Sequence, residues 1–209
     1  MSGSFHVSRF TTPGIALVLG ALSPVRSAGA QETGTPVFHA PYRSFTSHEI
    51  GASASFGRSE QTGLEGSYRR GVGAVDVALR AGWMILDGGT DGFVLGLDGR
   101  VPLVSELRFP LRGALVTGVG LDFRNGTGVW VPVGLSLGRR LTVEHSAVSL
   151  VPYLQPTLLF TSVAADDVGF GLGLGLDLRL STAFEVRVSG SFGTDAAPAG
   201  VAVTAAWLK

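Results

Sequence analysis

The sequence contains no cysteine, only one lysine and no long apolar run. Without cysteine the chain has no disulfide, thiol nucleophile or thiolate metal ligand. A membrane-spanning helix needs roughly 20 consecutive apolar residues, so the missing run argues against a helical membrane protein. The sequence has fifteen arginines but a single lysine, Lys209. Because water-facing surfaces normally carry lysine, its shortage indicates that most charged groups do not face bulk water.

The N-terminal thirty residues have the order of a secretory signal. A weakly basic start with His6 and Arg9 precedes an apolar stretch over 15–22 and small residues ending at Ala30. This order predicts a signal peptide over 1–30, cleaved after Ala30. The apolar stretch is too short for a membrane anchor.

Removal of the signal leaves a nearly neutral chain. It takes away Arg9 and Arg26, so 14 basic groups remain against 16 acidic ones. No basic excess is left to attract nucleic acid, and we expect no nucleic-acid partner. The remaining length predicts one domain.

Strict alternation of apolar and polar residues dominates the chain after residue 47. Ten segments alternate with period two, the pattern of half-buried strands: 48–57, 62–70, 74–86, 92–103, 111–124, 128–139, 148–161, 168–181, 183–193 and 199–208. Turn residues separate most of the segments, which predicts antiparallel neighbours. The expected fold is all-β, an antiparallel up-and-down transmembrane β-barrel over 48–209 with ten strands, or eight as the alternative. Residues 31–47 are polar and aperiodic and predict a periplasmic lead-in, and the sequence leaves open whether this segment enters the barrel.

Two sets of residues indicate that the apolar face points outward to lipid. The polar face combines glycine with charges that suit an ion-paired interior, because arginine and carboxylate forks pair well there. This expected lumen network is Arg69, Asp76, Arg80, Asp98, Arg100, Arg112, Asp122, Arg124, Asp177, Arg179, Glu185 and Arg187. Aromatic residues of apolar-face parity lie near the strand ends, where membrane interfaces select them. These expected girdle residues are Phe56, Tyr68, Trp83, Phe93, Phe123, Phe160, Phe170, Phe184, Phe192 and Trp207.

With these features the chain resembles the small single-chain outer-membrane β-barrels, the outer membrane protein β-barrel domain family related to the outer-membrane-protein-A transmembrane barrel. The resemblance covers Glu49 to Lys209 and includes a final strand that carries Trp207. In the family, the assembly machinery is thought to recognise a C-terminal strand that ends in an aromatic residue. Here Trp207 stands two residues before the end. The resemblance implies a bacterial outer-membrane location, a lipid environment and insertion by the barrel-assembly machinery.

Catalysis has little to use in this sequence. Of the four histidines, His6 lies in the signal, His39 and His48 lie in or near the lead-in, and His145 lies in a turn. Glu144, His145 and Ser146 are adjacent on that turn and cannot reach one another in the geometry of a hydrolase triad. We therefore expect no enzyme, no catalytic residue, no cofactor and no metal.

Two functions follow from the sequence as hypotheses. The first is a monomeric outer-membrane barrel with a structural role in the envelope, or with slow passage of small solutes through a charge-filled lumen. The alternative is a secreted soluble β-barrel that binds an apolar ligand inside. The two differ in whether the leucines or the arginines face the interior.

Overall fold

The computed structural model describes residues 33–57, 61–87, 89–104, 110–124, 127–142, 146–162, 167–194 and 199–209. The expected signal peptide and His145 lie outside the described residues. In the part of the chain that is described, no helix has the length and apolarity needed to cross a membrane.

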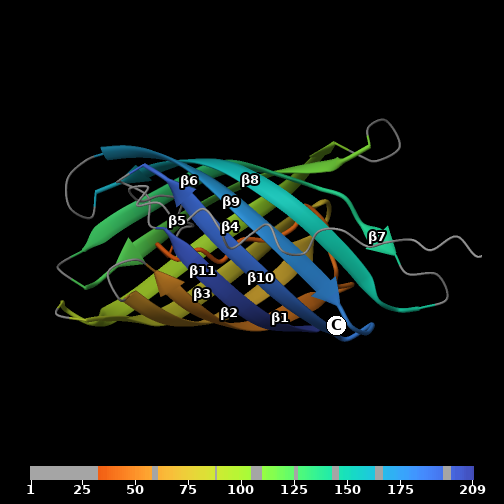
Figure 1. Ribbon diagram of the computed structural model, residues 1–209, viewed down its shortest axis with the longest axis horizontal. Helices are drawn as coiled ribbons and strands as arrows, with labels where there is room; N and C mark the ends of the chain where they lie inside the picture. Colours follow the sequence, from red (N-terminus) through yellow and green to blue (C-terminus); the bar gives the residue numbers. More distant parts are fainter. Residues whose placement is uncertain are drawn as a thin grey trace, which may run out of the picture.

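One antiparallel sheet contains all the strands (Figure 1). They are β1 (His48–Gly57), β2 (Gln61–Val72), β3 (Val75–Leu86), β4 (Gly92–Val104), β5 (Arg112–Asp122), β6 (Gly128–Gly138), β7 (Leu141–Thr142), β8 (Ser149–Thr161), β9 (Asp167–Arg179), β10 (Phe184–Gly193) and β11 (Gly200–Leu208). Each of the ten expected segments agrees with an observed strand to within two residues at either end. The two-residue β7, which pairs only with β8, was not predicted.

The sheet closes on itself into a barrel of ten strands. Neighbours along the chain pair as hairpins, β1 pairs with β11, and β6 pairs with β8 across the short β7. Closure gives the wall strands hydrogen-bonding neighbours on both sides, which a membrane environment demands. The predicted up-and-down barrel and its ten strands are confirmed. We call the end that holds the C-terminus the near end and the opposite end the far end (Figure 1).

Alternation along each strand separates the two faces of the wall. In β3, Asp76 and Arg80 are buried inside while Leu79 and Trp83 are at least half exposed outside. A pleated strand sends successive side chains to opposite faces, so the period of two in the sequence becomes the division between lumen and exterior.

Strand β6 is held less continuously than the other strands. Its pairing with β5 omits Pro132, and its pairing with β8 omits the positions around Pro156. Proline has no N–H and cannot donate to the ladder, so each ring removes a hydrogen bond from the wall. Strand β6 therefore has a pairing defect on both edges.

The lumen is occupied by the chain's own residues 33–45, which we call the lumen segment. Figure 1 shows it in red to orange, running inside the ring of strands. Residues 33–42 are all buried. The sequence left its position open, and the structure places it inside the barrel.

The glycine-rich inner face of β9 makes room for the lumen segment. A Cβ atom at Gly173 would lie 2.8 Å from two ring carbons of Phe38. A Cβ at Gly175 would collide with the ring of Tyr153, which packs with Phe38 and Tyr42 in one buried cluster. The glycines of β9 thus leave room for aromatic rings inside the barrel, while the leucines that alternate with them point outward.

Candidate functional site: a charged and filled lumen

Arginines and carboxylates pair in the interior of the barrel, and most of these side chains are almost fully buried. Arg69 Nη2 lies 2.8 Å from Asp98 Oδ1, and Arg100 Nη2 lies 2.5 Å from Asp76 Oδ2. Arg80 pairs with Glu65. Buried charges persist only when they are paired. Two of these pairs join neighbouring strands, and Arg69 of β2 reaches across β3 to Asp98 of β4.

Arg187 is the centre of the largest charge cluster. Its Nη1 and Nη2 atoms each donate to Glu49 at 2.6 Å, and its Nε donates to Glu185 at 2.7 Å. The nearest oxygen of Asp177 lies 3.6 Å from Nε. One guanidinium thus bridges β1, β9 and β10, with a bidentate fork that gives geometric specificity.

The lumen segment is bound mainly through its backbone. Ser189 donates to the carbonyl of Pro36 and accepts from the N–H of Phe38. Ser136 donates to the carbonyl of His39 at 2.9 Å, and the N–H of Ala40 donates to Asp177 at 3.3 Å. These contacts reach β6, β9 and β10, so the segment ties distant parts of the wall together.

Arginines of the wall provide further contacts to the same segment. Arg80 donates to Thr35 at 3.2 Å, and Arg100 donates to the carbonyl of Ala40. In return Arg43 of the segment donates to Asp76 at 2.5 Å. The lumen segment and the ion pairs of the wall therefore belong to one hydrogen-bonded network.

His39 sits inside this network as a neutral ring. Arg187 Nη1 lies 3.1 Å from its Nδ1 atom. Since an arginine N–H can only donate, Nδ1 must carry a lone pair, and the proton of the ring is on Nε2. A neutral ring adds no further charge among the surrounding arginines, and its buried Nε2 atom has no hydrogen-bond partner among the described residues.

The expected lumen residues occupy three different environments. Ten of them, including the partners at the far end, Asp122 and Arg124, form carboxylate–arginine contacts. Arg179 is only half-buried and donates to the backbone carbonyls of Ser181 and Thr182 in the turn after β9. Arg112 lies at the near mouth beside Tyr42. The prediction of one network was therefore too broad for Arg179 and Arg112.

Sequence reasoning missed three members of the network. Glu49 and Glu65 are buried partners of Arg187 and Arg80. Their inward parity on the first two strands was visible in the sequence and could have identified them. Arg43 carried no such signal, because the lumen segment has no periodicity.

The aromatic side chains lie on the exterior near the two ends of the barrel. In register, Phe184, Trp207, Ile50 and Tyr68 form one row across β10, β11, β1 and β2 at the near end. At the far end the rings of Phe93 and Phe123 stack at 6.4 Å. All the expected girdle residues are at least 38% exposed except Phe184, which is half-buried.

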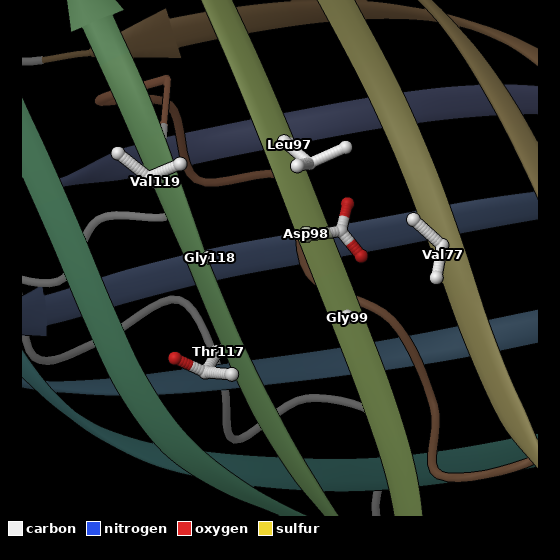
Figure 2. A pocket seen from close by; sticks show the side chains of 7 residues that line it. All are labelled: Val77, Leu97, Asp98, Gly99, Thr117, Gly118 and Val119. Carbon is white, nitrogen blue, oxygen red and sulfur yellow. The ribbon is translucent and has the colours of Figure 1, made fainter.

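Aliphatic side chains cover the exterior between the two ends. The exposed ones include Leu79, Leu97, Leu158 and Leu174, on four different strands. A shallow depression of about 340 Å³ interrupts this surface where Gly99 leaves a gap, and Figure 2 shows Val77, Leu97 and Val119 around it. An apolar belt around a closed barrel with a charged interior is the reverse of a water-soluble protein.

The molecule is a transmembrane β-barrel. No family model matches the sequence, and no curated protein matches it. Among solved structures, the barrel is similar to a de novo designed transmembrane β-barrel, with 12% identity over 85% of this chain and 98% of that chain and a TM-score of 0.39. It is also similar to the β domain of the Bordetella autotransporter BrkA, with 14% identity over 77% and 96% and a TM-score of 0.46. The N-terminal β-barrel domain of Pseudomonas aeruginosa OprF is similar at 14% identity over 77% and 95%, with a TM-score of 0.36.

Proposed function

We propose that this protein is a non-enzymatic β-barrel of the bacterial outer membrane with a structural role in the envelope. In this proposal the chain is exported by a cleaved signal peptide, inserted by the barrel-assembly machinery and surrounded by lipid as a monomer. The observation that carries the structural role is the filled lumen. In the part of the chain that the structure describes, residues 33–45 and the ion pairs occupy the interior and leave little room for a solute path.

The contacts of the lumen segment favour a closed barrel over slow solute passage. Its residues from Thr33 to Tyr42 are buried, and wall residues on five strands bind it. A network hydrogen bond contributes about 0.5–1.5 kcal/mol, and bonds to charged groups contribute more. Several such contacts acting together would hold the segment in place.

A soluble carrier for apolar ligands, the alternative function, requires the apolar face of the strands to point inward and the charged face to point outward. A carrier would present Leu174 to an interior cavity and Arg187 to water. In this barrel Leu174 is 46% exposed and Arg187 is 3% exposed. The arrangement of the two faces therefore supports the membrane barrel.

Cell fractionation tests the location. We expect the native protein in the outer-membrane fraction, and we expect the detergent-extracted protein to migrate differently on gels before and after heating. Recovery of native protein in the soluble periplasmic fraction would contradict the proposal.

Planar-bilayer recording tests the closed lumen. The refolded mature chain should show no stepwise conductance. A Gly173→Val variant provides the matched comparison, because its side chain would overlap the ring of Phe38 and push the lumen segment aside. We expect conductance steps from the variant only. Steps of similar size and frequency from the unmodified chain would refute a structural role that depends on a closed lumen.

A further inference from the structure

Two arginines at the near mouth differ from the paired arginines of the barrel. Arg112 begins β5, and Arg140 follows the end of β6 by two residues. Among the described residues, no carboxylate lies within 4.0 Å of either guanidinium. Carboxylates do lie within that distance of the following arginines: Arg43, Arg69, Arg80, Arg100, Arg124 and Arg187.

Both unpaired guanidiniums lie against one aromatic ring. The Cζ atoms of Arg112 and Arg140 are 5.2 Å and 4.5 Å from the ring centroid of Tyr42. The Tyr42 hydroxyl accepts from the backbone N–H of Arg140 at 2.9 Å, which holds the ring at the end of β6. The ring of Tyr42 thus serves as a platform that both guanidiniums contact.

The platform leaves the two guanidiniums with unused donors. The Nε atoms of Arg112 and Arg140 are buried, and neither has a hydrogen-bond partner among the described residues. A cation–π contact contributes only about 0.5–2 kcal/mol and satisfies no N–H. A buried donor without a partner is costly, because it has lost its water and gained no acceptor. An anion that accepts from these donors would therefore be stabilised here.

We propose that Arg112 and Arg140, arranged on Tyr42, bind a phosphate group at the near mouth of the barrel. A phosphate carries a charge between −1 and −2 and several acceptor oxygens, so it would offset both guanidiniums, whereas one carboxylate would offset only one. The planar fork of arginine suits bidentate recognition of phosphate. Arg112 has the parity of the lumen face of β5, and both arginine side chains are partly exposed, so a soluble anion can reach them.

Titration of the refolded mature chain with inorganic phosphate tests this site. The protein is held in maltoside micelles, which contain no phosphate, and binding is followed by calorimetry. We expect Arg112→Gln and Arg140→Gln each to weaken binding at least tenfold. Arg70→Gln is the matched control, because it removes the same charge at the same end from an exposed outward position, and it should change the affinity by less than twofold.

A second titration separates the two sources of a phosphate group. Short-chain phosphatidylglycerol, below its own micelle concentration, replaces inorganic phosphate. Binding of either compound with loss in both glutamine variants supports the site and identifies its source as a soluble phosphate or a lipid headgroup. Absence of binding for both, or binding that Arg70→Gln weakens equally, overturns the proposal. Neither result affects the closed lumen, which the conductance measurement decides separately.

Discussion

Replacement of Arg187 is the most direct test of the buried charge network. Arg187→Met keeps much of the side-chain volume and removes the cation that Glu49 and Glu185 contact at 2.6–2.7 Å and Asp177 approaches at 3.6 Å. Loss of one member of a buried ion pair costs about 3–5 kcal/mol, because the remaining charge is left without compensation. Three carboxylates lose their main partner here, so we expect the loss of stability to lie at the upper end of that range.

Equilibrium unfolding in urea, followed by tryptophan fluorescence in detergent micelles, measures this loss. The control is Arg70→Met, which removes an exposed arginine at the same end and should change stability by at most about 0.5 kcal/mol. A double-mutant cycle of Glu49→Gln and Arg187→Gln should give a coupling energy of about 1.5–3 kcal/mol, since the two bonds are charged and buried. A loss below about 1 kcal/mol for Arg187→Met would refute the view that these charges depend on one another.

Further predictions concern the lipid-facing wall and strand β6. Leu97→Arg places a charge within the apolar belt and should destabilise the barrel by about 2–4 kcal/mol. Val72→Arg, at the near end of β2, should destabilise it by only about 0–1 kcal/mol. Urea unfolding from lipid vesicles measures both losses, and equal losses would contradict the assigned depths of the two positions. Pro156→Val restores an N–H opposite Leu135 and should slow amide hydrogen exchange in β6, measured by mass spectrometry, while exchange in β3 stays unchanged. Unaltered exchange in β6 would show that proline is not the cause of the pairing defect.

The strands and their faces could be predicted because they depend on a local pattern. In β9 the leucines stand at every second position, and each one points outward as the period of two requires. Each strand pairs with its neighbour along the chain, and the turn residues between the strands already indicate this pairing. The expected bounds were therefore accurate even without any related sequence for comparison.

The lumen segment could not be predicted, because its contacts are not local. Wall side chains bind its backbone carbonyls and N–H groups, and any residue type offers those groups. The one signal was indirect: the inward glycines Gly173 and Gly175 leave space that something else must fill. The sequence also does not indicate which charged residues pair across the lumen, because partners such as Glu49 and Arg187 are 138 positions apart.

The position of the lumen segment constrains how the protein is assembled. Phe38, near the start of the described chain, is hydrogen-bonded to Ser189, 151 positions later. Contacts over such separations form slowly, because a long loop must close before they contribute. If the strand cylinder sealed first, the segment would have to thread into a space lined by unpaired charges. We therefore expect the barrel to close and the lumen segment to enter it in one step. The lumen segment is synthesised before the strands, so it reaches its final position only when the last hairpin forms.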